Sequence, residues 1–465
     1  MSDFEHEPPV VANVVKNEYE REPVPEHALK GPKSFWGMYA GEHAAGTEFM
    51  IGPLFLLAGV SLQNIFWGLL LGNILAVCSW RFLCAPIATR ARMTLYFQLE
   101  KIAGKGLVKV YNLANGILFC FLAGAMITVS ATAVGIPFNL EMPAFDAIYP
   151  NSLTFVAIVV GVGAVITVVA SLGYEAVAKF ANIAAPWMVL VFFGCGVVAL
   201  KQLGVTSYAE LESIWSESIT FAQAGTEGAP MGFWSVVLFA WFCNAAMHVG
   251  MSDLSVFRYA KKPSAGWATL GGMFIGHYMA WIAAAFMLAA QIKLVQSATP
   301  VPGPMANNVA GLAGIICVIV AGWTTANPTI YRAGLAFQAI FPKSRRLTMT
   351  LTAGAIATFA AVFPAFAFKL LGFVGLYGTI LAPMGAIIFA DWSFSRRVGI
   401  TQFYAERHGI LYNPSVLLAW LIPVAVALYF IVGKGGTAWY FPLPAWIACG
   451  MLYLVFSRFL QKTTS

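Results

Sequence analysis

The sequence predicts an all-α polytopic membrane protein with 12 transmembrane helices. Hydrophobic residues make up 59% of its 465 residues and charged residues only 10%, whereas a soluble domain usually carries about 25% charged residues. The mean hydropathy is +0.76. A chain of this composition cannot cover a water-exposed surface with polar side chains, so most of its surface is expected to face lipid.

Twelve apolar stretches approach the length of about 20 residues that a helix needs to cross the hydrocarbon core. They lie at about 35–61, 62–85, 108–136, 152–171, 174–200, 231–252, 266–290, 309–333, 347–363, 366–390, 415–433 and 439–459. Residues 1–33 precede them and are rich in Glu, Pro and Lys. Because no apolar run lies before the first span, this segment is expected to be a cytoplasmic tail and not a signal peptide.

The distribution of basic residues supports this division into spans. If the N-terminus is cytoplasmic, 22 of the 27 Lys and Arg residues fall on the cytoplasmic side. The four that fall outside are Lys201, Lys293, Lys369 and Lys434. Since cytoplasmic loops are enriched in Lys and Arg, the pattern predicts a multi-pass protein of the cell (inner) membrane with both termini cytoplasmic. It also accounts for the net charge of +7, so no nucleic-acid partner is expected.

Sequence motifs for enzyme chemistry are missing. No H-E-x-x-H, G-x-S-x-G or Walker loop occurs, so the chain is not expected to be an enzyme or to be driven by ATP. The seven cysteines are scattered, mostly through apolar runs, without a C-x-x-C pair. They are expected to pack as small apolar residues, and no cofactor is expected.

The stretch AGEHAAGTEF is the most unusual feature of the first span. It places Glu42, His43 and Glu48 between the apolar runs SFWGMY and MIGPLFLLAGV. A charged residue at mid-bilayer costs about 2.5–3.5 kcal/mol on insertion scales, so such residues usually face a cavity. Gly41 and Gly46 weaken the helix locally. Irregular backbone at this depth is tolerated only where it lines a cavity or is buried in protein.

Two further spans carry polar clusters. The sixth holds Asn244 and His248 in FCNAAMHVG, and the eighth holds AGWTTANPTIYRAG. The polar residues of the eighth are Thr324, Thr325, Asn327 and Thr329. Pro328 frees a backbone carbonyl one turn earlier. Free carbonyls and threonine hydroxyls are hard oxygen ligands, which suit a small cation such as Na+.

The first and sixth spans also begin alike, with Phe-Trp in SFWGMYAGEH and in GFWSVVLFAWFCNAAMHVG. Five spans separate their starts, so the two enter the membrane from opposite sides. Interrupted helices at matching positions of two inverted halves point to the binding site of a transporter.

Simpler interpretations of these polar residues stay open. Thr324 and Thr325 can bond back to carbonyls one turn earlier. His43 and His248 suit packing positions, and Glu42 suits a gating or structural group paired with a Lys or Arg near the inner face. Glu48 lies close to mid-span, and its alternative role is a structural partner of one of these histidines.

Five stretches in order resemble the nucleobase:cation symporter-1 family of secondary transporters, the purine–cytosine permease group. They are LLLGNILAV, GYEAVAKFANIAAPWM, SDLSVFRYAKKP, GWTTANPTIYRAGLAFQAIFP and ILAPMGAIIFADWSFSRR. The resemblance extends from Phe35 to Arg397. It implies the leucine-transporter-like fold, with a 5+5 inverted repeat and two additional C-terminal helices, functional as a monomer.

The resemblance also implies a domain organisation. Residues 1–33 form the cytoplasmic tail, 34–200 the first five-helix repeat and 201–397 the second, inverted repeat. Residues 398–465 form two accessory helices and a short cytoplasmic tail. The substrate is expected between spans 1, 3, 6 and 8, where helices 1 and 6 unwind.

In sodium-coupled members, the resemblance implies an ion between spans 1 and 8. The expected ligands are the carbonyls of Ala44, Thr47 and Ala321 and the hydroxyls of Thr324 and Thr325. Na+ is the expected coupling ion, with H+ as the alternative.

Glu48 then lies where a side chain of the family contacts the substrate. The Trp that many members carry in the third span is replaced by NGILFCFLAG, and the Asn found later in the eighth span of some members aligns with Ile330. The candidate substrate-binding residues are therefore Glu48, Phe119, Phe121, Trp241, Asn244 and Asn327. The aromatic residues among them suit packing equally.

These observations predict cation-coupled symport of a small nitrogen-rich heterocycle, such as a cytosine- or purine-like nucleobase, by alternating access. One alternative is a symporter of the same fold for a cationic, amidine or amino-acid-like solute. A more distant alternative is a channel.

Overall fold

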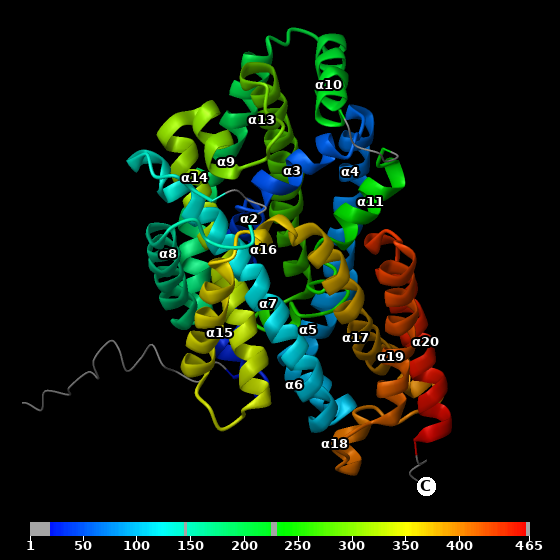
Figure 1. The fold of residues 1–465 in the computed structure, drawn as a ribbon. Coiled ribbons are helices and arrows are strands. Elements are labelled where there is room, and N and C mark those ends of the chain that lie inside the picture. The colour runs from blue at the N-terminus through cyan, green and yellow to red at the C-terminus, as the bar shows by residue number, and fades with distance from the viewer. Residues whose placement is uncertain (1–18, 144–146, 225–229, 462–465) are drawn as a thin grey trace, which may run out of the picture.

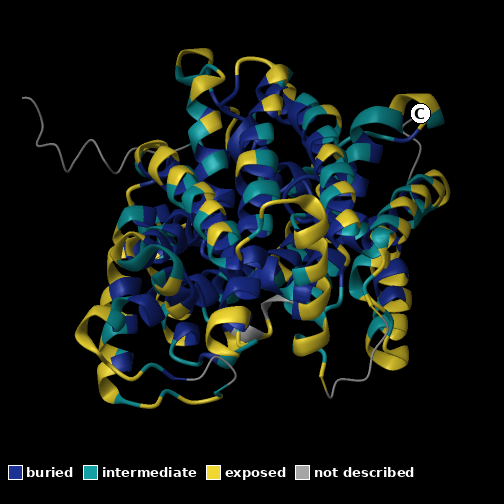
Figure 2. Ribbon diagram, turned by 90° about the horizontal axis from the view of Figure 1, so that it is seen from above, coloured by how far each residue is buried: buried dark blue, intermediate teal, exposed yellow. Residues whose placement is uncertain are grey.

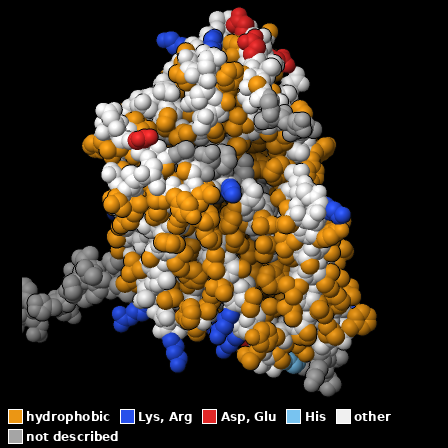
Figure 3. Space-filling view, viewed as in Figure 1, with side chains coloured by type: hydrophobic (Ala, Val, Ile, Leu, Met, Phe, Trp, Pro, Cys, Tyr) orange, Lys and Arg blue, Asp and Glu red, His pale blue; other side chains and the backbone are white. Residues whose placement is uncertain are grey.

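The computed structural model describes residues 19–143, 147–224 and 230–461, and within them the chain is all-helical (Figure 1). A single isolated bridge pairs Lys30 with Ala260 in this part of the chain. Figure 3 shows a broad band of apolar side chains, with Asp and Glu visible mainly at one end, called the acidic end, and several Lys and Arg at the opposite, basic end. A few other Lys or Arg side chains lie along the band and beside the acidic residues. The acidic end carries α10 (Tyr208–Ala222), and the basic end carries α6 (Leu95–Ala103) and α18 (Tyr404–His408) (Figure 1).

The helices follow one another with short connections. In chain order the others are α2 (Lys33–His43), α3 (Glu48–Leu57), α4 (Leu62–Ser79), η2 (Trp80–Cys84), α5 (Ala85–Ala91), α7 (Lys105–Val134), α8 (Leu153–Ser171), α9 (Tyr174–Leu203), α11 (Phe233–Phe242), α12 (Leu254–Phe257), η4 (Pro263–Ala268), η5 (Gly271–Tyr278), α13 (Met279–Val295), α14 (Pro302–Ile340), α15 (Arg346–Ala361), α16 (Ala365–Phe368), α17 (Leu370–Val398), α19 (Pro414–Leu428), η6 (Tyr429–Gly433) and α20 (Pro442–Leu460).

Nine helical segments among the described residues are long and apolar enough to cross a membrane. The chain is therefore a multi-pass membrane protein, although this measure does not confirm the expected count of 12. Three expected spans fall short for a physical reason. The first and sixth are each divided into two shorter pieces, and α15 has only 16 residues.

The first span breaks where the sequence places its polar residues. Helix α2 ends at His43, and α3 begins at Glu48. Gly46 lies within this break, close to the backbone of α14. A Cβ added there would lie 3.2 Å from the Cα of Gly322 and 3.0 Å from a methyl group of Val129. A side chain at this point would therefore press against α14 and α7, which favours glycine in the break.

The sixth span breaks in a similar way. Helix α11 ends at Phe242, turns follow, and α12 begins at Leu254. Met251 has a positive φ of 64°, which an L-residue adopts only at some cost. Gly385 of α17 packs directly against this turn, because a Cβ added there would lie 1.9 Å from the carbonyl oxygen of Val249. The unwinding of helices 1 and 6 thus agrees with expectation.

The two broken helices are enclosed by long neighbours. Helix α14 packs along α7 and also contacts α9 and α15, while α3 packs against α13 and α2 against α9. Seen from above, buried residues fill the middle of the molecule and exposed residues form its rim (Figure 2). The breaks are thus shielded from lipid by complete helices.

Candidate functional site

The break in the first span borders an internal cavity with a volume of about 50 Å³. Glu42, His43, Thr47 and Glu48 all line it. These residues come from the last turn of α2, the break itself and the first residue of α3. The polar stretch of the first span therefore faces an enclosed space, as the cost of burying a charge in lipid predicts.

Four other elements complete the polar wall of this cavity. The break of the sixth span contributes Asn244, and η5 contributes His277. Helix α14 contributes Thr325, and α17 contributes Tyr377. The cavity thus lies where both broken helices meet α14.

Glu48 is buried and held by donors from two elements. Its Oε1 accepts a hydrogen bond from the Thr47 hydroxyl at 3.0 Å, and its Oε2 accepts one from the indole N–H of Trp281 on α13. The Nε2 of His277 lies 3.6 Å from Oε1. No Lys or Arg in the described part of the chain pairs with this carboxylate.

Glu42 belongs to a different network. The Arg332 guanidinium of α14 pairs with both oxygens of Glu42 and, at 2.8 Å, with Oδ1 of Asp253. The Tyr39 hydroxyl and the Trp80 indole N–H each donate to Oδ2 of Asp253 at 2.7 Å. Glu42 therefore forms the structural ion pair that was one of its interpretations from the sequence. This pair lies between the cavity and the basic end.

The three histidines near the break occupy different settings. The Nδ1 of His43 lies 2.8 Å from the carbonyl oxygen of Tyr39, and its ring meets that of His277 edge-on at 4.8 Å. His277 stacks on Trp281 with ring centres 4.2 Å apart. The Nε2 of His248 bonds to the carbonyl of Trp241 at 2.8 Å and the ring does not line the cavity, which fits its packing interpretation.

The oxygens expected to hold a cation are partly brought together. The hydroxyl of Thr325 lies 3.0 Å from the carbonyl oxygen of Glu42 and 3.3 Å from that of Ala321. The hydroxyl of Thr324 lies 2.9 Å from the same Ala321 oxygen. Both hydroxyls therefore donate to a carbonyl about one turn earlier in α14, as the simpler interpretation expects. The hydroxyl of Thr325 also contacts the backbone of the first span at Glu42.

The hydrogen bonds of the first-span carbonyls can be compared with the ligands expected from the sequence. The contact of Thr325 is to Glu42, two positions before Ala44. The carbonyl of Thr47 accepts the backbone N–H groups of Met50 and Ile51 in the first turn of α3. Within the described residues no group of three or more His, Cys, Asp or Glu side chains is arranged to hold a metal ion. A cation here would depend on carbonyl and hydroxyl oxygens.

Of the substrate-binding candidates, Glu48 and Asn244 line the cavity. Phe119 does not line it, but its ring packs edge-on against Tyr377 at 5.5 Å and so supports the wall from behind.

The remaining candidates lie away from the cavity. The ring of Phe121 packs against Phe366 at 5.1 Å. Trp241 stacks on Phe242 at 4.6 Å and donates its indole N–H to Ser79. Asn327 is buried, with no hydrogen-bond partner for its amide among the described residues.

Several residues of the site were not singled out from the sequence. They are His277, Trp281, Tyr377, Asp253 and Arg332. A signal was present for three of them, because ionisable residues within apolar runs mark functional positions. For Trp281 and Tyr377 no signal existed, since aromatic residues are common throughout the spans.

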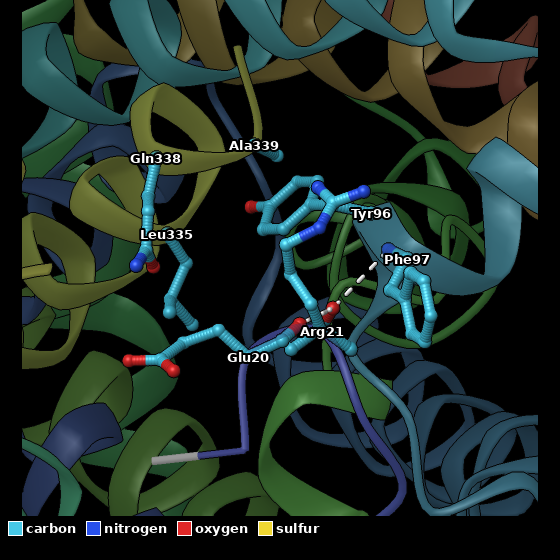
Figure 4. Close-up of a pocket in the computed structure, with 8 residues that line it drawn as sticks. Glu20, Arg21, Tyr96, Phe97, Leu335, Gln338 and Ala339 are labelled. Carbon is cyan, nitrogen blue, oxygen red and sulfur yellow. Dashed lines mark hydrogen bonds between the residues drawn. The ribbon is translucent and has the colours of Figure 1, made fainter. Parts of the chain in front are cut away.

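A smaller pocket lies between the N-terminal segment, α6 and α14 (Figure 4). It is lined by Glu20 and Arg21 of the N-terminal segment and by Tyr96 of α6, among others. Arg21 bonds to both carboxylate oxygens of Glu100 at 2.8 Å. The Tyr96 hydroxyl donates to the backbone carbonyl of Arg332 at 3.2 Å, so this pocket and the ion-pair network are directly connected.

The fold is shared with solved transporters. Mhp1, described as a nucleobase-cation-symport-1 family transporter in a closed conformation with bromovinylhydantoin bound, has a TM-score of 0.72, 17% identity and 96% of each chain covered. The chain therefore has the leucine-transporter-like fold.

Two other proteins show the same fold. A Na+-coupled sialic acid symporter in a substrate-bound outward-open state has a TM-score of 0.65 and 12% identity, with 96% of this chain and 93% of that chain covered. MhsT in complex with L-phenylalanine has a TM-score of 0.57 and 15% identity, with 90% of this chain and 97% of that chain covered. Mhp1 is described as a transporter and the sialic acid protein as a symporter.

Sequence comparison alone adds no relative. No protein-family model matches the chain, and no curated protein matches it by sequence. At these identities the likeness to solved structures establishes the leucine-transporter-like fold, whereas the site must be argued from this chain's own residues.

Proposed function

We propose that this protein is a secondary active transporter that couples Na+ to symport of a small nitrogen-rich heterocycle, such as a cytosine- or purine-like nucleobase. One observation carries the proposal. The break at residues 44–47 borders one cavity that contains both a buried carboxylate, Glu48, and the hydroxyl of Thr325 next to two carbonyl oxygens. An ion and a solute bound in adjacent positions can then stabilise the same conformation, which is the basis of coupling.

The solved structures of similar fold support this assignment at a coarser level. Mhp1 is described with bromovinylhydantoin bound, and the sialic acid symporter is described as Na+-coupled. A ring with nitrogen donors and acceptors suits a cavity lined by Glu48, Asn244 and His277. Alternating access would proceed by movements around the two broken helices.

The arrangement in the membrane is part of the same proposal. The chain lies in the cell (inner) membrane with both termini and the basic end in the cytoplasm, and it works as a monomer. Residues 34–200 and 201–397 are the two inverted repeats, and residues 398–465 supply the accessory helices.

Uptake into proteoliposomes tests the proposal. Purified protein should take up radiolabelled cytosine, hypoxanthine or uracil faster under an inward Na+ gradient than under an equal K+ gradient. Equal uptake from a pH gradient without Na+ would indicate H+ coupling instead. A channel would not drive labelled substrate into liposomes preloaded with unlabelled substrate, so a lack of counterflow would contradict alternating access.

A further inference from the structure

The buried side chains around the cavity carry more negative than positive charge. Glu42, Asp253 and Glu48 supply three carboxylates, and all three are nearly inaccessible to solvent. Arg332 is the one guanidinium that pairs with this group among the described residues, and it bridges Glu42 and Asp253. Glu48 takes no part in that network.

The donors that hold Glu48 do not compensate its charge. The Thr47 hydroxyl and the Trp281 indole are neutral. The His277 Nε2, at 3.6 Å from Oε1, is beyond ordinary hydrogen-bond distance. A buried carboxylate without a countercharge is strongly unfavourable. Such a carboxylate is relieved either by taking up a proton or by pairing with a cation, and a cationic solute next to Glu48 would supply the second.

The coupling ion does not meet this need by itself. A Na+ held by Thr325, the Ala321 carbonyl and the Glu42 carbonyl would lie beside the Glu42–Arg332–Asp253 network. It would offset the one excess negative charge of that network. None of these three oxygens is hydrogen-bonded to Glu48, whose hydrogen-bond partners among the described residues are the neutral Thr47 hydroxyl and Trp281 indole.

Unpartnered polar atoms of the cavity wall indicate the hydrogen-bonding character of the ligand. The Nδ1 of His43 faces the Tyr39 carbonyl, so it carries the hydrogen of the neutral ring and the unpartnered Nε2 is an acceptor. The Nδ1 of His277 is likewise unpartnered, and it is an acceptor when Nε2–H faces Glu48. Asn244 supplies an unpartnered donor, Nδ2, and the unpartnered hydroxyl of Tyr377 can donate or accept.

The rest of the wall fits a small flat body. Ile51, Leu122 and Val374 contribute apolar surface, and Tyr377 contributes an aromatic ring. When the carboxylate of Glu48 is counted with the two imidazole nitrogens, acceptors exceed donors on this wall, so a complementary ligand is rich in N–H groups. An amidinium or guanidinium within a ring combines a positive charge with several N–H donors, as such a ligand requires.

We propose that the transported solute is a small cationic heterocycle of the cyclic amidine or guanidine class, with its positive charge paired to Glu48. This inference rests on the proposed function and narrows it from nitrogen-rich heterocycles to cationic ones. The other ionisable groups that face the cavity or its walls are Tyr39, Glu42, His43, Cys243, His248, Asp253, His277, Arg332 and Tyr377.

Matched pairs of compounds of nearly equal shape and different charge test the inference. The cations are 2-aminoimidazoline and acetamidine, and their neutral counterparts are 2-imidazolidinone and acetamide. Thermal unfolding of the purified full-length protein is followed with each compound in NaCl and in KCl, because a ligand that binds the folded state raises the unfolding midpoint. We expect each cation to raise the midpoint more than its neutral counterpart.

A variant that removes the charge of Glu48 tests whether this carboxylate causes the preference for cationic compounds. Glu48→Gln should weaken binding of 2-aminoimidazoline by about thirtyfold or more, because one partner of a buried charge pair is lost. Binding of 2-imidazolidinone should change by less than this. Glu212→Gln is the matched control, since it makes the same change on an exposed residue of α10. If Glu48→Gln does not fold, the comparison of charged and neutral compounds on the parent protein still tests whether the solute is cationic.

The outcomes separate this inference from the proposed function. If no cation exceeds its neutral counterpart, including the case in which none binds, the inference is overturned. Na+-driven uptake of neutral cytosine would in that case leave the proposed function standing. If the cations bind through Glu48 but NaCl and KCl act alike, the inference stands and Na+ coupling fails.

Discussion

Arg332 of α14 forms a buried ion pair with Glu42 of α2, and the two residues are 290 positions apart in the chain. Arg332 lies on the side of Thr325 toward the basic end, because α14 runs from the cavity to that end. The pair therefore fastens α2, the half of the first span before the break, to α14.

Replacing Arg332 tests the importance of this contact for stability. Arg332→Ala leaves Glu42 and Asp253 buried without their shared cation, so we expect a loss of about 3–5 kcal/mol. The measurement is the thermal unfolding midpoint of the purified protein. Lys343→Ala is the control, since Lys343 is exposed at the same end. An unfolding midpoint of Arg332→Ala equal to that of the control would show that the pair does not stabilise the fold.

The hydroxyl of Thr325 provides a test of the proposed ion site. Thr325→Ala removes one oxygen near the carbonyls of Ala321 and Glu42. We expect the Na+ concentration for half-maximal uptake to rise roughly tenfold, which corresponds to about 1.4 kcal/mol. Thr325→Ser keeps the hydroxyl and should stay near the parent value. Thr324→Ala should act in the same direction as Thr325→Ala.

A matching Na+ dependence in Thr324→Ala, Thr325→Ala and the parent would favour the back-bonding interpretation of both hydroxyls. Total loss of protein from the membrane would instead point to a structural role, and the amount of folded protein must be measured alongside uptake.

The orientation in the membrane is predicted by the distribution of basic residues. Segments 90–109 and 342–346 should face the cytoplasm, whereas α10 should lie outside. Single cysteines at Lys105 and Lys343 should resist an impermeant thiol reagent applied to whole cells, and a cysteine at Glu212 should react. All three positions are exposed. Reaction at Lys105 and Lys343 with protection at Glu212 would mean that the orientation is inverted.

The helical architecture was largely predictable because apolar length and basic-residue position are local properties of the sequence. The break in the first span was likewise indicated by its charged residues and its glycines. Helix α10, however, is not among the expected spans. It is short and lies at the acidic end, outside the apolar band (Figures 1 and 3), so neither a long apolar stretch nor a run of basic residues marks it.

The site was only partly predictable because its contacts join distant parts of the chain. The carboxylate of Glu48 could be singled out from its unusual position, but its indole partner Trp281 is 233 residues away. The direction of an aromatic ring is set by packing, so Phe121 and Trp241 face other aromatic side chains and not the cavity. Such contacts between distant residues cannot be predicted from the periodicity or the composition of the sequence.

The last prediction concerns Gly52 of α3. A Cβ added there would lie 2.2 Å from the carbonyl oxygen of Trp281 and 2.9 Å from the Cβ of Ala284. Neither the backbone oxygen nor the short Ala side chain can rotate away, so Gly52→Ala must push α3 and α13 apart. We expect a loss of about 1–3 kcal/mol from this overpacking.

Gly161→Ala in α8 is the matched control for that change. It is also a glycine inside a helix, but a Cβ added there meets nothing within 4 Å. Its only effect should be a gain of up to about 1 kcal/mol from helix propensity. The thermal unfolding midpoints of the two variants should therefore move in opposite directions. Because the backbone of Trp281 also positions the indole that donates to Glu48, Gly52→Ala should in addition weaken solute binding. Parent-like stability and binding in Gly52→Ala would show that the α3–α13 contact does not fix the position of Glu48.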